Sequence, residues 1–276
     1  MEAGWRAAGT LVGHPEVQAA AREVLARRPA RRRRDWGRVW LPTTVAGVFS
    51  LFLFGWADRE FAPGYRTGVG EQRLLVLDDG SRVRLNTDSA VRVVFWGDTR
   101  RVYLNRGQAF FEVAHDPARP FLVDAGDAEV RALGTRFEVR RERDDVAVTL
   151  VEGRVRVEDD RGHVAELAPR QQLRVGEGGI SDALPVASDA VSWTTGRLVF
   201  HDTPLGAAVA EVNRYSTRKL ELQGVGQLAD EPVSGVFDAG DVEAFAAAVG
   251  QVYGLRRLEG AGDGIRLAPA GPGSAG

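Results

Sequence analysis

The sequence predicts a single-pass membrane protein in which an all-β domain, solenoid-like or sandwich-like, is followed by a small α+β domain of βαββαββ order. The first observation is an uncharged stretch at residues 39–57, within the roughly 17–25 residues that a helix needs to cross a bilayer. The second is a series of short alternating hydrophobic runs with turn signals over residues 71–176, which is typical of strands. The third is a return of helical periodicity within residues 197–267.

The expected membrane helix is bounded by aromatic residues. Trp36 and Trp40 stand at one end of residues 39–57 and Trp56 stands at the other, where tryptophans anchor a helix at the lipid–water interface. A signal peptide and a buried core helix are the alternatives. A signal peptide would lie in about the first 15–30 residues, and a core helix rarely has an arginine run beside it, so we predict a true span.

Arginine is concentrated before this span. The residues concerned are Arg22, Arg27, Arg28, Arg31, Arg32, Arg33, Arg34 and Arg38. The expected spacer at residues 58–70 contains only Arg59 and Arg66. Because basic residues mark the cytoplasmic side of a span, we expect residues 1–38 in the cytoplasm and the rest of the chain across the membrane. A nucleic-acid patch is the alternative for the arginine run, but lipid head groups beside a span explain it better.

A short amphipathic helix is expected in the cytoplasmic segment, at residues 14–28. Its hydrophobic residues fall on one face, because they follow helical spacing. They are Val17, Ala20, Val24 and Leu25. Such a stripe cannot bury itself in so short a segment, so it either docks on a partner or lies on the lipid surface.

Composition limits the chemistry that the chain can perform. The 276 residues carry a net charge of −2 and no cysteine, which argues against a nucleic-acid-binding exterior and excludes disulfides and thiolate metal sites. The four histidines, at positions 14, 115, 163 and 201, lack metal-ligand spacing. No nucleotide-binding glycine loop or nucleophile elbow is present. We therefore expect no metal, no cofactor and no turnover enzyme.

The β part and the α+β part are separated by a change of pattern. Strand starts recur about every ten residues through 71–176, which fits a sandwich, a barrel or a solenoid. Residues 177–196, rich in Gly, Ser, Ala and Asp, are expected to form a linker. Thr203 is the expected cap of a first helix, and Asp241 and Gly254 are expected to bound a second. The second helix should bury Val242, Phe245, Val249 and Val252. Residues 268–276 are expected to be a disordered tail.

Several stretches resemble the FecR-type transmembrane anti-sigma regulators, in the order in which that family has them. They are LDDGSRVRLNTDS (77–89), RVYLNRGQAFFEVAHDPARPFLV (101–123), VRALGTRFEVR (130–140) and LVEGRVRV (150–157). The resemblance extends over residues 65–175. Residues 197–267 are also similar to the family's small C-terminal domain, which is itself like the short N-terminal domain of secretins and TonB-dependent transducers.

The resemblance implies a signalling protein of a bacterial inner membrane, with its C-terminus in the periplasm. Its cytoplasmic segment would bind an extracytoplasmic-function sigma factor, with Val17, Ala20, Val24 and Leu25 as contacts. Its periplasmic part would sense the N-terminal signalling domain of an outer-membrane TonB-dependent receptor, often one used in iron uptake, and site-specific proteases would transmit the signal. The family's cytoplasmic domain is usually longer than residues 1–38, which implies either a misassigned start or sigma-factor binding that is reduced or lost.

The resemblance also implies one chemical step. Gly134-Thr135 matches the Gly-Thr pair at which some family members cut themselves, by attack of the Thr hydroxyl on the preceding carbonyl. The alternative is that Gly134 only permits a β-bulge. For the whole chain, the alternative function is a membrane-anchored periplasmic binding or assembly module without sigma-factor control.

Overall fold

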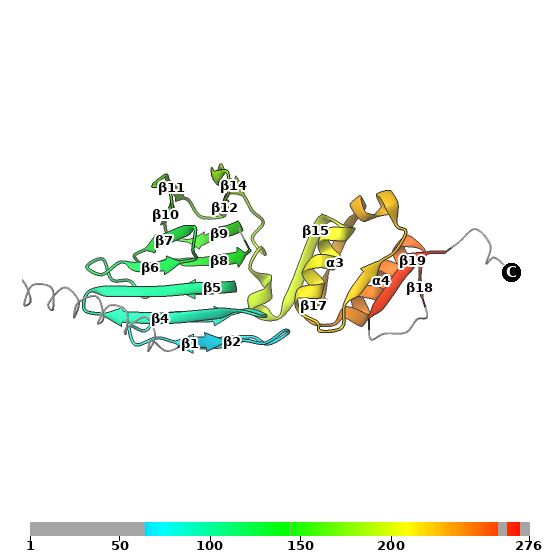
Figure 1. Ribbon diagram of the computed structural model, residues 1–276, viewed down its shortest axis with the longest axis horizontal. Coiled ribbons are helices and arrows are strands. Elements are labelled where there is room, and N and C mark those ends of the chain that lie inside the picture. The colour runs from blue at the N-terminus through cyan, green and yellow to red at the C-terminus, as the bar shows by residue number, and fades with distance from the viewer. Residues whose placement is uncertain (1–63, 144, 259–263, 271–276) are drawn as a thin grey trace, which may run out of the picture. The chain divides into compact units, whose positions relative to one another are not determined.

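A computed structural model describes residues 64–143, 145–258 and 264–270 (Figure 1). The chain divides into two units, residues 1–57 and 58–276, and the described residues all belong to the second. The expected span, its tryptophan anchors and the expected cytoplasmic helix therefore lie outside the described residues. Among the residues that are described, no helix is long and apolar enough to cross a membrane.

The first part of the described chain, residues 64–185, is built only of strands and turns and is called the β domain below. Its strands are β1 (Gly64–Arg66), β2 (Arg73–Val76), β3 (Arg82–Leu85), β4 (Ala90–Trp96), β5 (Thr99–Glu112), β6 (Phe121–Asp124), β7 (Ala128–Ala132), β8 (Arg136–Glu142), β9 (Asp145–Glu152), β10 (Val155–Asp159), β11 (Val164–Leu167), β12 (Gln171–Gly176), β13 (Gly179–Ile180) and β14 (Leu184–Pro185). The mostly β character that the alternating pattern predicts is confirmed.

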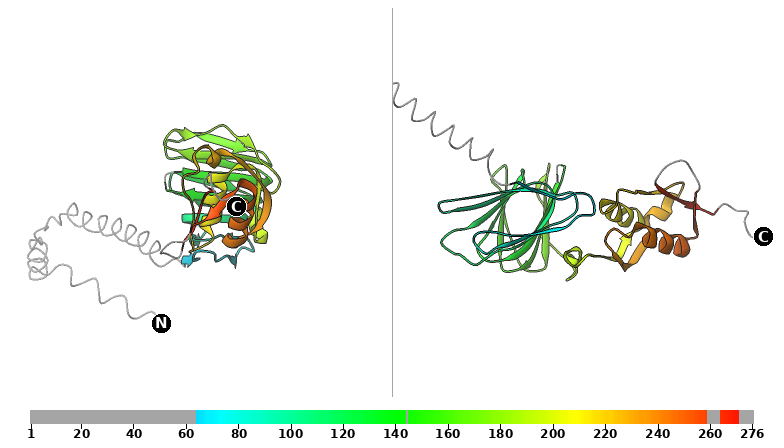
Figure 2. Two further views of the ribbon diagram at one scale, coloured as in Figure 1. Left: turned by 90° about the vertical axis from the view of Figure 1, so that its right-hand side faces the viewer. Right: turned by 90° about the horizontal axis from the view of Figure 1, so that it is seen from below.

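The long strand β5 organises the β domain by belonging to two sheets. Its first half pairs with β4 and β6, and its second half pairs with β3 and β8. The remaining strands extend these sheets on either side, so that the sheet is nearly closed around one core (Figure 2). Only the β5–β6 pairing is parallel among the described strands of this domain. A solenoid stacks its strands in parallel, so this mostly antiparallel, nearly closed sheet argues against a solenoid.

The core of the β domain follows from the strand alternation. Alternate side chains of each strand point inward, and the aromatic residues meet at the centre. Phe111 of β5 stacks on its cross-strand partner Phe137 with ring centroids 5.0 Å apart, and it meets Phe121 edge to face at 6.1 Å. Such pairs add about 0.5–1.5 kcal/mol beyond the burial of their area.

One ion pair is buried in the β domain. Arg100 Nη1 lies 2.9 Å from Asp79 Oδ2, and the two side chains are only 2% and 5% exposed. The same guanidinium donates hydrogen bonds to the carbonyl oxygens of Ala114 and Arg119. Because a buried charge is tolerated only with its hydrogen bonds satisfied, these contacts fix the loop at 113–120 against the turn at Asp79.

The second part, residues 192–269, is called the α+β domain. Its elements are β15 (Arg197–Pro204), α3 (Leu205–Arg214), β16 (Leu220–Leu222), β17 (Pro232–Asp238), α4 (Val242–Tyr253), β18 (Leu255–Arg257) and β19 (Ile265–Pro269), with short 3₁₀ turns η1 (Ser192–Thr195) and η2 (Gly226–Asp230). This is the βαββαββ order that the sequence predicts. β15 pairs with β17, and β16, β19 and β18 form a separate sheet.

The helix ends agree only in part with the predicted caps. The Asp241 side chain accepts a hydrogen bond from the Ala244 amide at 2.9 Å, and Gly254 ends α4 in the left-handed conformation, so both predictions for α4 are confirmed. The cap of α3 is Pro204 and not Thr203, because β15 continues through both residues. Val252 is 74% exposed, so its predicted burial is wrong.

Segments that the sequence leaves irregular contain regular structure. β1 lies within the expected spacer at 58–70, while β13, β14 and η1 lie within the expected linker at 177–196. Ala268 belongs to β19 and not to a tail. β1 is held by β4, a strand distant in sequence, so local composition does not reveal it. β13 and β14 are instead held by the nearby strand β12.

Candidate functional site

The two domains share a buried junction. Phe110 of β5 points away from the core of the β domain and packs with the core of the α+β domain, where it is 5% exposed. This explains why Ala109, Phe110 and Phe111 are buried in succession, since this stretch of β5 is covered on both faces. The junction is therefore an extension of a hydrophobic core and not only a surface contact.

A tryptophan from η1 closes one side of the junction. Trp193 is 3% exposed, and its indole Nε1 donates a hydrogen bond to the carboxylate of Glu138 on β8, which is 4% exposed. The Trp193 carbonyl oxygen accepts a hydrogen bond from Gln72 Nε2 at 3.0 Å. Burial raises the pKa of Glu138, and hydrogen bonds from Trp193 and Gln108 offset part of that shift. The carboxylate is thus held in a dry site by donors from both domains.

A second group of hydrogen bonds closes the other side. Asn86 Nδ2 donates to the Tyr215 hydroxyl at 2.6 Å and to Gln108 Oε1 at 2.7 Å. Arg214 Nη2 also donates to Gln108 Oε1, at 2.9 Å, and the Thr87 hydroxyl donates to the Arg214 carbonyl oxygen at 2.8 Å. Burial, with the nearby Glu211 carboxylate, raises the pKa of Tyr215 to about 12. Tyr215 therefore stays protonated at any physiological pH.

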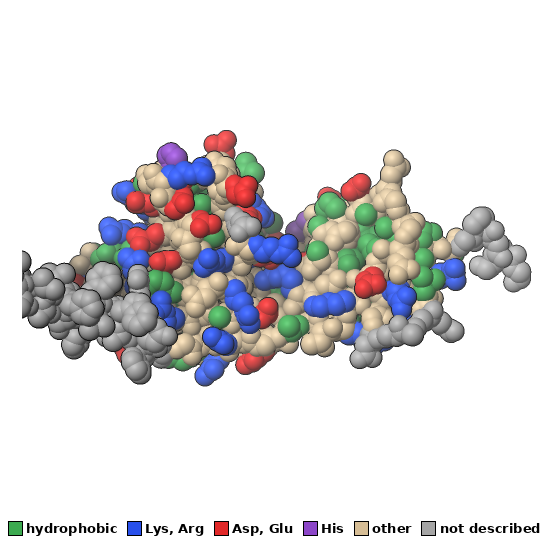
Figure 3. Space-filling view, viewed as in Figure 1, with side chains coloured by type: hydrophobic (Ala, Val, Ile, Leu, Met, Phe, Trp, Pro, Cys, Tyr) green, Lys and Arg blue, Asp and Glu red, His purple; other side chains and the backbone are tan. Residues whose placement is uncertain are grey.

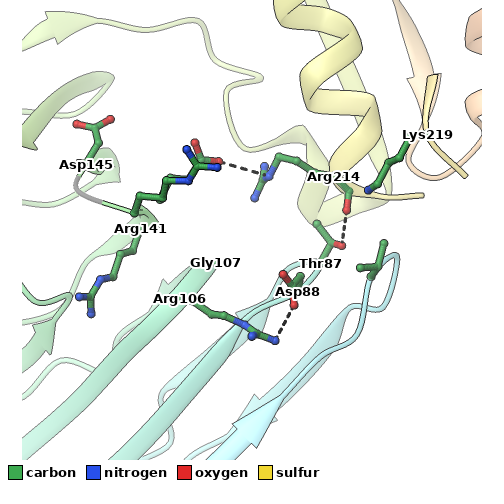
Figure 4. Close-up of a pocket in the computed structure, with 11 residues that line it drawn as sticks. Thr87, Asp88, Arg106, Gly107, Arg141, Asp145, Arg214 and Lys219 are labelled. Carbon is green, nitrogen blue, oxygen red and sulfur yellow. Dashed lines mark hydrogen bonds and ion pairs between the residues drawn. The ribbon is translucent and has the colours of Figure 1, made fainter. Parts of the chain in front are cut away.

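A pocket of about 610 Å³ opens beside these contacts (Figure 4). It is lined by Val69, Thr87, Asp88, Arg106, Gly107, Arg141, Glu142, Arg143, Asp145, Arg214 and Lys219. Several of its charges are already paired, as Arg106 is with Asp88 at 2.6 Å and Arg214 is with Glu142 at 3.6 Å. Figure 4 shows the first pair on the wall formed by the β domain and Arg214 and Lys219 on the opposite wall. The pocket is therefore a polar cleft lined by residues of both domains.

The outer surface of the β domain carries charges of both signs. Figure 3 shows acidic and basic side chains interspersed over its strands. Among the exposed pairs, Arg154 lies 3.5 Å from Glu166 and Arg156 lies 3.6 Å from Glu158. Exposed pairs of this kind contribute about 0–1 kcal/mol each, so the domain depends for its stability mainly on its hydrophobic core.

The predicted cleavage pair lies between β7 and β8. Gly134 has a φ of +153°, a conformation that favours glycine. Thr135 is 5% exposed, and its hydroxyl oxygen is buried without a hydrogen-bond partner among the described residues. On the far side of the pair, a Cβ on Gly153 would lie 2.7 Å from Thr135 Cγ2 and 3.1 Å from the Gly134 carbonyl oxygen. The peptide bond is therefore enclosed, with a nucleophilic side chain that forms no bond of its own.

A smaller pocket of about 270 Å³ lies next to this peptide. It is lined by His115, Arg131, Leu133, Gly134, Thr135, Arg154, Arg156 and Glu166. A bulge does occur nearby, between Arg136 and Phe137 in the β8–β9 pairing. The bulge does not account for the unpaired hydroxyl, because a buried polar atom without a partner costs free energy.

Of the predicted site residues, only Gly134 and Thr135 lie in the described part of the chain. Val17, Ala20, Val24, Leu25, Trp36, Trp40 and Trp56 lie outside it. In the described ranges no group of His, Asp and Glu is arranged to hold a metal ion.

Sequence reasoning missed the junction. Two signals of it were available in the sequence. Trp193 is a lone tryptophan among small and polar residues, and Glu138 is a glutamate within a strongly hydrophobic strand. Neither identifies the other as its partner, because they are far apart in sequence.

The comparisons with known proteins agree with this architecture. Residues 64–156 match the family described as FecR protein, which confirms over this range the resemblance drawn from the sequence. Among curated proteins, none matches the chain significantly.

Two crystal structures of a candidate anti-sigma factor from Parabacteroides distasonis ATCC 8503 are similar to the chain. Both are 27% identical with a TM-score of 0.65. One covers 76% of this chain and 100% of its own length, and the other covers 75% and 99%. The likeness therefore extends beyond the FecR match into the α+β domain.

The buried carboxylate at the junction makes stability depend on pH. Because its pKa is raised in the folded protein, the folded state holds this proton more tightly than the unfolded chain does. The resulting stabilisation is present below the unfolded pKa of about 4.3 and is lost as the pH rises through the folded pKa. Glu138→Gln should remove this decline from the free energy of unfolding measured by urea titration between pH 4 and 8.

Glu158→Gln is the matched control, since Glu158 is an exposed strand carboxylate, and it should leave the pH dependence unchanged. Trp193→Phe keeps the aromatic packing but removes the indole donor, so it should lower the free energy of unfolding by about 1–3 kcal/mol. A wild-type pH profile that persists in Glu138→Gln would show that this carboxylate is not the source.

Proposed function

We propose that the chain is an inner-membrane regulator of an extracytoplasmic-function sigma factor. The observation that carries the proposal is the FecR domain at residues 64–156, together with the shared fold of a candidate anti-sigma factor over most of the chain. In this proposal residues 39–57 span the membrane with the C-terminus in the periplasm. Residues 1–38 hold the sigma factor through the stripe of Val17, Ala20, Val24 and Leu25.

The α+β domain is proposed to receive the signal from outside. Its partner would be the N-terminal signalling domain of an outer-membrane TonB-dependent receptor, such as one that imports a ferric siderophore. β15 and β17 form a two-stranded sheet among the described strands, so each has an outer edge that can accept a strand from a partner. Val236 on β17 is 58% exposed and supplies hydrophobic surface at that sheet. Site-specific proteases would then release the cytoplasmic fragment.

Capture of the sigma factor tests this proposal. The full-length chain, expressed with an affinity tag and solubilised from membranes, should retain one extracytoplasmic-function sigma factor of its organism. Val24→Asp and Leu25→Asp place a charge in the hydrophobic stripe and should abolish retention, while Arg22→Gln on the same segment should not. Failure of the wild type to retain any sigma factor would favour the alternative, a membrane-anchored periplasmic binding or assembly module.

A second proposal, supported by the unpaired Thr135 hydroxyl, is a single self-cleavage at Gly134–Thr135. The hydroxyl oxygen attacks the Gly134 carbonyl carbon, the peptide C–N bond breaks, and the hydroxyl proton passes to the Thr135 nitrogen. Water then hydrolyses the ester to a Gly134 carboxylic acid and a restored Thr135 hydroxyl. Gly134 adopts a φ of +153°, which glycine tolerates because it lacks a Cβ.

Denaturing gels test the self-cleavage. The wild type should give fragments 1–134 and 135–276, which should elute together under native conditions because β8 stays paired with β5, and β10 with β7. Thr135→Ala should remain one full-length band, whereas Thr135→Ser keeps a hydroxyl and should still be cut. The proposal is wrong if wild type and Thr135→Ala both remain full-length.

A further inference from the structure

The loop that faces the Gly134–Thr135 peptide carries a histidine in direct contact with it. A Cβ built on Gly134 would lie 2.5 Å from His115 Nδ1 and 3.0 Å from His115 Cα. The imidazole thus occupies the space that any side chain at position 134 would need. Gly134 is required for two reasons, its backbone conformation and the room it leaves for this ring.

Backbone hydrogen bonds on both sides hold the histidine in place. The Val113 amide donates to the Thr135 carbonyl oxygen at 3.0 Å, and the Asp116 amide donates to the Leu133 carbonyl oxygen at 3.1 Å. His115 lies between these two bonds and therefore faces Gly134 directly. The buried Arg100 guanidinium fixes the same loop through the Ala114 carbonyl oxygen, at 3.1 Å.

We infer that His115 is the residue that carries the proton during cleavage at Gly134–Thr135, a role that rests on the self-cleavage proposed above. The imidazole accepts the proton from Thr135 Oγ1 as that oxygen bonds to the Gly134 carbonyl carbon. It returns the same proton to the Thr135 nitrogen as the C–N bond breaks. No net proton is gained or lost, and no other reactant enters before the hydrolysis of the ester by water.

The other residues of the pocket are poor candidates for this task. Arg131, Arg154 and Arg156 keep their protons in proteins and cannot act as a base. Glu166 lies 3.5 Å from Arg154 and is paired with it. His115 is the remaining side chain of the pocket lining that can both accept and return a proton.

A time course of cleavage after cell-free synthesis of the full chain tests this inference. General acid–base groups contribute about 10²–10⁴-fold to rates, so His115→Ala should slow cleavage by at least about 10²-fold. Because the substitution leaves a space beside Gly134, added imidazole should restore part of the rate in His115→Ala. His163→Ala removes an exposed histidine from the β10–β11 turn, and it should cleave at the wild-type rate without a response to imidazole.

Each outcome of this experiment bears on the inference differently. Cleavage of His115→Ala at the wild-type rate would overturn the role of His115 and leave the self-cleavage standing. Slow cleavage without imidazole rescue, in a variant whose circular dichroism and thermal unfolding match the wild type, would also overturn it, because His115 would then be only structural. A wild type that stays uncleaved would overturn the self-cleavage itself, and this role with it.

Discussion

The hydrogen bond from the Trp193 indole to the Glu138 carboxylate is the interaction on which the junction between the two domains most depends. A carboxylate buried in this way is unstable unless donors surround it, and its donors come from both domains. Trp193 lies in η1 and packs in the core of the α+β domain, and Gln108 belongs to β5 of the β domain. The α+β domain therefore supplies a donor that the buried carboxylate of the β domain requires, and the two domains are expected to fold as one unit.

β8 connects this junction to the proposed chemistry. The strand begins at Arg136, directly after Thr135, and it carries both Glu138 and Arg140, which pairs with Glu211 of α3 at 2.9 Å. A partner that displaces the α+β domain would disturb these contacts first. β8 therefore joins the junction to the residue next to the proposed cleavage point along a single strand. Its pairing with β5 would hold the two fragments together after cleavage.

Much of the fold could be predicted from local patterns in the sequence. Alternation reveals the strands, and Asp241 and Gly254 mark the ends of α4 because a cap depends on a few neighbouring residues. The choice between sandwich and solenoid could not be predicted, since it rests on which distant strands pair. β1 could not be predicted for the same reason, because it forms by pairing with the distant strand β4. Val252 falls on the hydrophobic face that helical periodicity predicts for α4, but it is exposed. Periodicity identifies which face of a helix packs inward, and it does not show how much of that face the rest of the protein covers.

The residues of the candidate site also differ in whether the sequence could predict them. Gly134 and Thr135 could be identified from a motif, because their chemistry lies in two adjacent residues. His115 is adjacent to them only in space, brought there by the loop between β5 and β6. The junction residues Glu138 and Trp193 are 55 positions apart, and only the folded chain shows that they are partners.

Calorimetric unfolding tests most directly whether the two domains form one unit. Residues 58–276 carrying Thr135→Ala, which keeps the chain continuous, should unfold in one transition whose calorimetric and van't Hoff enthalpies agree. Two separate transitions would contradict the account, because they would show that the α+β domain melts independently of the β domain and that the buried junction does not couple them.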